Sequence, residues 1–130
     1  MLQSVIFIDD DLPTNIVNRR LAIRSNCFED IQFYKNSMEA LAYLQSLSNV
    51  SNFPDLIFLD INMPVMDGWQ FLDQLKTIDQ HSCIKIVMLS TALRVSEEEK
   101  NKYADIISAY ESKPLTIEKI RTHTNYLDAV

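Results

Sequence analysis

Short runs of apolar residues alternate along the chain with stretches in which apolar residues recur at helical spacing. Apolar runs of this length, bounded by turn-forming residues, are typical of buried strands. The pattern predicts strands over residues 5–8, 31–34, 56–59, 84–89 and 106–110. The first, third and fourth runs are the most apolar, so we expect them at the centre of a sheet and the other two at its edges.

The intervening stretches predict helices, each preceded by residues that favour a helix start. These start signals are Asp11 with Pro13, Ser37, Asp67, the capping-box pair Ser96 and Glu99, and Thr116. In the first helix Ile16, Val17 and Leu21 stand at helical spacing, and we expect them to face the core. The fourth helix is rich in charge and poor in apolar residues, so we expect it to be the least firmly held element.

Strands that alternate with helices indicate an α/β protein with helices on both faces of a parallel sheet. We predict a doubly wound (βα)5 fold, flavodoxin-like, with a five-stranded parallel sheet in the order 2-1-3-4-5. The chain has 130 residues, of which 47% are hydrophobic, and no linker long enough to separate two domains. We therefore expect one domain over residues 1–130, with its functional site beyond the carboxyl ends of the strands.

Composition and charge exclude several classes of function. The formal net charge of −6 repels a phosphate backbone and argues against direct nucleic-acid binding. The only glycine is Gly68, whereas the dinucleotide-binding and P-loop motifs need several glycines. The apolar run near the start is too short for a signal-peptide core or a membrane span, so we expect a cytoplasmic protein without membrane insertion.

Several charged side chains come directly after predicted strands. Asp9 and Asp10 follow the first strand, Asp60 follows the third, and Lys113 comes after the fifth. Because the carboxyl ends of parallel strands meet at one edge of the sheet, we expect these groups to lie together. Neighbouring carboxylates repel one another, and an oxygen-lined cluster of this kind suits Mg²⁺ or Mn²⁺.

Asp60 has the weakest structural explanation among these residues. It ends an apolar run, and the next turn signals come too late in the chain for it to cap a helix. An aspartate beside a metal ion and a lysine is equipped to attack phosphorus and form an acyl phosphate. We therefore predict reversible phosphorylation of Asp60. Ser90 and Thr91 are candidate hydroxyl partners, although either could instead cap the loop after the fourth strand.

Four motifs carry a resemblance to a known family. They are VIFIDDD at residues 5–11, PDLIFLDINMPVMDG at 54–68, IVMLSTA at 86–92 and SKP at 112–114. Through these motifs, and over essentially its whole length, the chain resembles the receiver domain of two-component response regulators. No output domain follows in this sequence, so we expect a single-domain regulator that signals through the receiver surface itself.

The resemblance implies a role for each candidate residue. The implied metal ligands are Asp9, Asp10, Asp60 and the backbone carbonyl of Asn62. Asp60 would be the phosphoacceptor, and Lys113, with a cis bond to Pro114, would pair with the phosphoryl group. Ser90 would be the switch hydroxyl, with Thr91 as its rival, and Tyr110 the switch aromatic residue.

The resemblance also implies partners. A histidine kinase or a histidine phosphotransfer protein would donate the phosphoryl group from phosphohistidine, and docking would use the sheet edge and the first helix. A downstream protein target would read a conformational change of the face made by helix 4, strand 5 and helix 5. The protein would be a phosphoacceptor that hydrolyses its own phosphoaspartate slowly, not a turnover enzyme. We expect His81 and His123 to be solvated surface residues without a phosphotransfer role.

Two other readings remain open. An aspartyl-phosphate hydrolase of the haloacid dehalogenase type would use Asp9 as its nucleophile, although Pro13 departs from that motif. The second alternative is a receiver fold that serves only as an unphosphorylated docking module.

Overall fold

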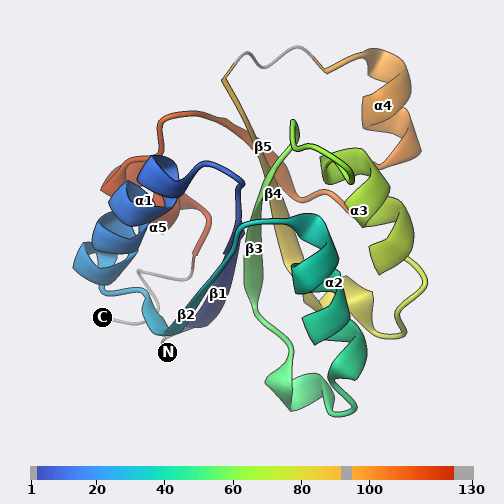
Figure 1. The fold of residues 1–130 in the computed structure, drawn as a ribbon, viewed down its shortest axis with the longest axis horizontal. Helices are drawn as coiled ribbons and strands as arrows, with labels where there is room; N and C mark the ends of the chain where they lie inside the picture. Colours follow the sequence, from blue (N-terminus) through green and yellow to red (C-terminus); the bar gives the residue numbers. More distant parts are fainter. Residues whose placement is uncertain (1–2, 92–94, 125–130) are drawn as a thin grey trace.

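A computed structural model describes residues 3–91 and 95–124. Within these residues five strands form one parallel sheet in the order β2-β1-β3-β4-β5 (Figure 1). The strands are β1 (Gln3–Ile8), β2 (Phe28–Tyr34), β3 (Leu56–Asp60), β4 (Lys85–Ser90) and β5 (Ala109–Ser112). The fold class, the strand order and the edge positions of the second and fifth strands predicted from the sequence are confirmed.

Helices cover both faces of the sheet. They are α1 (Leu12–Ser25), α2 (Ser37–Ser46), α3 (Gly68–Leu75), α4 (Glu97–Lys102) and α5 (Ile117–Thr122), with short 3-10 turns at Val50–Asn52 and His81–Cys83. Figure 1 shows α1 and α5 on one side of the sheet and α2 and α3 on the other, with α4 beside α3 at the edge of the molecule. This arrangement leaves the carboxyl ends of β1, β3 and β4 open for a site.

Side-chain caps fix most of the helix starts where the sequence predicts them. Asp11, Asp67, Ser96 and Thr116 are the N-caps of α1, α3, α4 and α5, and Asp67 and Ser96 both form complete capping boxes. The predicted start at Ser37 is one residue late. Asn36 caps α2 instead, because its Oδ1 accepts a hydrogen bond from the backbone N–H of Glu39 at 2.8 Å.

The predicted fifth strand is wrong in its position, since β5 begins three residues after Ile106. The backbone N–H groups of Ile106 and Ile107 both donate to the carbonyl of Tyr103, at 3.1 and 3.0 Å, and so belong to the turn after α4. Strand pairing begins only when Ser108 N donates to Ile86 O at 2.8 Å. Ile106 is buried, so the apolar run marks the core correctly but not the strand.

Helix α1 faces the sheet with the opposite side from the one that its apolar residues predict. Its buried residues are Asn15, Asn18, Ala22 and Ser25. Ile16, Val17 and Ile23 are 49%, 53% and 58% exposed, and Leu21 is half-buried against the core. Two of these polar side chains donate to backbone carbonyls, which offsets the cost of their burial: Ser25 Oγ to Ala22 O at 2.6 Å and Asn15 Nδ2 to Asp9 O at 2.9 Å. The inward-facing stripe expected at Ile16 and Val17 is therefore corrected.

Helix α4 has no buried residue between Glu97 and Lys102, as its composition predicts. Its first apolar anchor is Tyr103, the residue directly after the helix, which is only 3% exposed. Within the described ranges, no helix is long and apolar enough to cross a membrane.

The orientation of α1 predicts an unusual contrast between two isoleucines. Ile23→Ala should change the free energy of unfolding by less than about 0.5 kcal/mol, because an exposed side chain contributes little to the core. Ile57→Ala, at a fully buried position of β3, should cost about 2–5 kcal/mol. Denaturant unfolding of both variants measures the difference, and a comparable loss in Ile23→Ala would contradict the observed orientation of α1.

Candidate functional site

Three carboxylates meet where β1 and β3 end. Asp60 is the last residue of β3 and Asp9 follows β1 directly, and both are buried, while Asp10 is exposed. One carboxylate oxygen from each residue lies within 4.8 Å of the others. Oxygen ligands of this kind fit a hard divalent cation, which is held through carboxylates and keeps part of its water shell. The donor set therefore fits the metal class that the sequence predicts.

The first turn of α1 holds Asp9 in place. The backbone N–H of Asp11 donates to Asp9 Oδ1 at 2.9 Å, and Asn15 Nδ2 donates to the backbone carbonyl of Asp9 at 2.9 Å. Asp11 itself caps the helix through the backbone N–H of Thr14. Asp9 and Asp11 thus have separate tasks, since Asp9 faces the site and Asp11 starts the helix.

Gly68 allows α3 to begin directly against the strand that carries Asp60. Its backbone N–H donates to Ile61 O at 2.8 Å. A Cβ atom at this position would lie 2.8 Å from the carbonyl oxygen of Asp60 and 3.0 Å from Ile61 Cα, which is too close for any side chain. The start of α3 and the backbone of Asp60 are therefore in rigid contact.

Lys113 supplies the positive charge of the site. Its Nζ lies 2.7 Å from Asp9 Oδ2 and 3.4 Å from Asp60 Oδ1. Its backbone N–H donates to Ser90 O at 2.9 Å, which continues the pairing between β4 and β5, and its peptide bond to Pro114 is cis, as the family resemblance implies. One ammonium group thus bridges two buried carboxylates.

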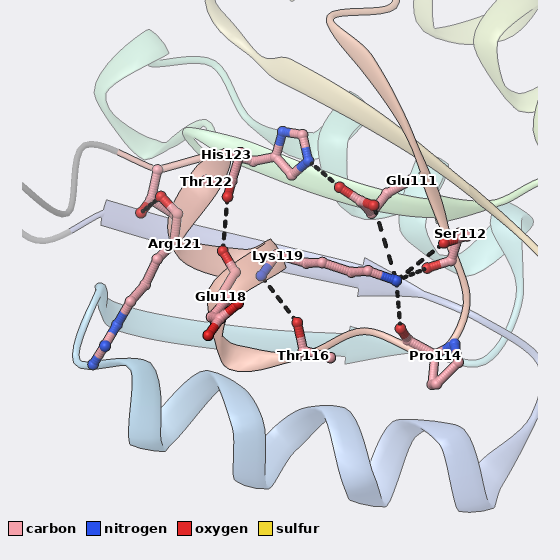
Figure 2. A network of polar contacts seen from close by, with 10 residues as sticks. Glu111, Ser112, Pro114, Thr116, Glu118, Lys119, Arg121, Thr122 and His123 are labelled. Atoms are coloured by element: carbon pink, nitrogen blue, oxygen red, sulfur yellow. Dashed lines mark hydrogen bonds and ion pairs between the residues drawn. The ribbon is translucent and has the colours of Figure 1, made fainter.

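Lys119 secures the loop that presents Lys113, and the sequence pattern does not reveal it. Its Nζ donates to Ser112 O, Ser112 Oγ and Pro114 O, each at 3.0 Å (Figure 2). These three acceptors lie on both sides of Lys113 in the chain. A lysine in the first turn of an amphipathic helix normally reads as solvated, so only the folded chain shows this role.

His123 is not the solvated residue that the sequence predicts. It is 8% exposed, and its Nε2 lies 2.8 Å from Glu111 Oε2, so it ties the end of α5 to β5 (Figure 2). His81 is half-buried, with Nδ1 2.9 Å from Ile78 O. Neither histidine lies in the carboxylate cluster.

Asp60 and Lys113 each shift the pKa of the other. Burial, and then the charge of Asp9, raise the pKa of Asp60 to about 6, while Lys113 acts in the opposite direction. For Lys113, burial alone lowers the pKa, but the hydrogen bond and charge of Asp9 together with Asp60 outweigh it and raise the pKa above its usual value. The ammonium therefore stays charged, whereas Asp60 is an aspartate with an unusually basic carboxylate.

The two candidate hydroxyls lie on opposite faces of the sheet. Met88 pairs with Tyr110 across β4 and β5, and Ser90, two residues after Met88, points to the same face as Tyr110. Ser90 is buried, whereas Thr91 is exposed and lines a groove of about 410 Å³ together with Pro13 and other residues of α1 and the loop before α5. Asn62, the implied carbonyl ligand, is exposed and donates its N–H to Asp60 Oδ1 at 3.3 Å.

Comparisons with known proteins agree on one family. A sequence model of the response regulator receiver domain matches residues 5–125. The chain is 28% identical over 128 residues to the polar-differentiation response regulator DivK of Brucella anthropi, with 98% of each chain covered. It is also 32% identical to the sensor protein EvgS of Escherichia coli (strain K12) over 96% of this chain, but it spans only 10% of EvgS. A crystal structure of a two component response regulator from Cytophaga hutchinsonii has a TM-score of 0.85 at 30% identity, with 98% of each chain covered.

The raised pKa of Asp60 predicts a stability effect in metal-free protein. The carboxyl ionises near 3.8 in the unfolded chain and near 6 in the folded chain, so the folded chain binds more protons between these values and loses stability as pH rises through them. Asp60→Asn should therefore raise the free energy of unfolding at pH 7.5 by about 2 kcal/mol. Denaturant unfolding in the presence of a chelator measures this.

The exposed Asp79 provides a matched control for that experiment. Asp79→Asn removes the same charge and should leave stability within about 0.5 kcal/mol of wild type. Equal stabilities of the Asp60 and Asp79 variants at pH 7.5 would contradict the electrostatic cost assigned to Asp60.

Removing the amine of Lys119 should loosen the loop around Lys113. Lys119→Met should lower the free energy of unfolding by about 1–3 kcal/mol, because three oxygen acceptors lose their common donor. Lys100→Met, on exposed α4, should have a negligible effect. Chemical denaturation compares the two, and similar stabilities would refute the positioning role of Lys119.

Proposed function

Because the chain belongs to the family of response regulator receiver domains, we propose that Asp60 accepts a phosphoryl group from a phosphohistidine in a Mg²⁺-dependent reaction. The protein is a receiver-domain response regulator of two-component systems. Receiver domains are signalling domains and not enzymes in the ordinary sense, and phosphorelay through an aspartyl phosphate is a general feature of the family.

One observation carries the proposal. Asp60 is buried at the end of a central strand, within 3.4 Å of an ammonium group and within 4.8 Å of two further carboxylates. Burying these charges together is costly unless they are used or paired. A phosphoryl acceptor needs a nucleophile close to cations, and this proposal is supported by the Lys113 ammonium beside Asp60 and by carboxylates that would hold a metal ion.

In the proposed reaction, a carboxylate oxygen of Asp60 attacks the phosphorus atom of the donor. The new O–P bond forms as the P–N bond to the donor histidine breaks, and the imidazole leaves with the electron pair and takes up a proton from solvent. The product is an acyl phosphate. Lys113 can follow one of the new oxygens because its Nζ already contacts Asp60 Oδ1, so the chain supplies mainly position and charge.

The proposed ligands of the cation are Asp9, Asp10, Asp60 and the backbone carbonyl of Asn62. Mg²⁺, or Mn²⁺ in its place, would neutralise charge on the transferred group. The residues of this chain orient it, since Asp9 is fixed by Asp11 and Lys113, and Asp60 is fixed by the pairing of β3 with β1 and β4.

We assign the switch hydroxyl to Ser90 and the switch aromatic residue to Tyr110. Both side chains lie on the same face of the sheet, and Tyr110 is half-buried against the cluster that covers that face. Thr91, the rival hydroxyl, lines a groove on the side of α1 and α5 and would have to cross the sheet to reach Tyr110. A conformational change that begins at Ser90 would reach β5 and the neighbouring α4 and α5.

Receiver domains interact with histidine kinases and with downstream targets. In this chain the exposed face of α1 suits the protein that donates the phosphoryl group. Leu12, Ile16 and Val17 expose apolar surface beside the site. The helix carries three arginines and no acidic residue. A histidine kinase or phosphotransfer protein with an apolar ridge and acidic flanks would fit this face, whereas a downstream protein would read α4, β5 and α5. We place this exchange in the cytoplasm, where ATP-dependent kinases act.

Intact-mass measurement after incubation with acetyl phosphate tests the proposal without the kinase. Wild type should gain a single phosphoryl group only with Mg²⁺, because the carboxylate cluster otherwise repels the anionic donor. Asp60→Asn should gain none. Asp11→Asn is the matched control, because asparagine still caps α1 and the variant removes a neighbouring charge without touching the acceptor.

The other outcomes separate the alternatives. No mass increase in a folded wild type under any condition would refute phosphorylation and leave an unphosphorylated docking module. An increase that persists in Asp60→Asn but is lost in Asp9→Asn would identify Asp9 as the nucleophile, as in an aspartyl-phosphate hydrolase. If Asp11→Asn, like Asp60→Asn, gains no mass, charge near the site rather than Asp60 itself would control the reaction.

A further inference from the structure

Tyr103 is the main anchor of α4. The helix itself has no buried residue, whereas Tyr103, its C-cap, is 3% exposed and belongs to the core cluster on the α2 and α3 side of the sheet. The helix lies at the edge of the molecule, beside α3 (Figure 1). The position of α4 therefore depends largely on what holds the ring of Tyr103.

Residues of α3 and its C-terminal end form a clamp around that ring, which we call the Tyr103 clamp (Trp69, Asp73, Lys76 and Tyr103). Trp69 stacks on Tyr103 with ring centroids 5.0 Å apart, and Lys76 Nζ lies 5.0 Å from the ring centroid. The hydroxyl of Tyr103 donates to Asp73 Oδ1 at 3.0 Å. Burial and Asp73 raise the pKa of Tyr103 to about 12, so the hydroxyl keeps the proton that it donates.

The clamp begins next to the backbone of the phosphoacceptor strand. Trp69 directly follows Gly68, whose position would bring a Cβ to 2.8 Å from Asp60 O and 3.1 Å from Met88 Cε. There is consequently no free space between the end of β3 and the start of α3. Because Gly68 packs directly on the backbone carbonyl of Asp60, a shift of the loop between β3 and α3 would be passed to Trp69, one residue after this contact, with no free space to absorb it.

We infer that the Tyr103 clamp is a second coupling route, which holds α4 in place in the unphosphorylated chain and opens when Asp60 is phosphorylated. The coupling rests on the proposed function, whereas the clamp itself does not. This route runs through α3 and leaves out Ser90 and Tyr110. Because coupling is reciprocal, any change that weakens the clamp also favours the phosphorylated arrangement of Asp60.

The first experiment tests the clamp in unmodified protein. Tyr103→Phe keeps the ring and its stacking but removes the hydrogen bond to Asp73. Amide hydrogen exchange across residues 97–106 should become roughly two- to tenfold faster, as expected for one lost hydrogen bond. Tyr43→Phe is the matched control, because it removes a hydroxyl of α2 that accepts from Gln32 of β2 and should leave this exchange unchanged. Unchanged exchange in Tyr103→Phe would overturn the clamp.

The second experiment tests the coupling with Mg²⁺ and beryllofluoride, a phosphoryl analogue that binds carboxylates. The Kd of beryllofluoride should fall roughly two- to tenfold in Tyr103→Phe and stay constant in Tyr43→Phe. Wild type should show faster exchange of α4 when the analogue is bound. An unchanged or weaker affinity in Tyr103→Phe would overturn the coupling.

The same measurements separate this inference from the proposed function. If wild type binds no analogue and accepts no phosphoryl group, the proposed function fails and the coupling with it, while the exchange data still decide whether the clamp exists. If wild type is phosphorylated but the exchange of α4 is the same in both states, only the coupling fails.

Discussion

The ion pairs of Lys113 with Asp9 and Asp60 are the interaction on which the rest of the structure depends. Two carboxylates buried this closely would repel each other strongly without a cation between them. The ammonium comes from the far edge of the sheet, so β5 must pair with β4 and the loop after it must keep its course. Lys119 holds that loop, the first turn of α1 holds Asp9, and Gly68 sets the close approach of α3. Each of these contacts helps to hold the carboxylates of Asp9 and Asp60 beside the ammonium of Lys113.

The sequence predicts this edge of the sheet well because one rule of parallel sheets covers it. Strands β1, β3 and β4 are continuous apolar runs. The polar residues at their carboxyl ends lie together at one edge of the sheet, however the helices pack. Asp9, Asp10, Asp60 and Lys113 therefore come together from residue types and order alone. The fifth strand is the exception, because its apolar run forms a turn before the pairing starts.

The remaining differences arise where periodicity carries no information about neighbours. Helix α1 buries small polar side chains, and a pattern that ranks residues by hydropathy cannot foresee that Asn15 and Ser25 donate to backbone carbonyls there. Lys119 and His123 look like solvated helix residues until the strand beside them is placed. Trp69 and Tyr103 are far apart in sequence, and their stacking depends on the packing of two helices that the pattern treats separately. Local patterns thus predict elements, whereas contacts between elements need the fold.

The inward polar face of α1 has a consequence for how such a chain can change over generations. The residues of α1 that pack against the sheet are Asn15, Asn18, Ala22 and Ser25. The isoleucines, the valine and the arginines on its outer side therefore contribute little to the core. Substitutions on this surface meet little penalty in folding, so duplicated copies could drift toward different signalling circuits while keeping the same chemistry at the sheet edge. Under the proposed docking through α1, discrimination between partner proteins would then rest on a few exposed side chains of this one helix.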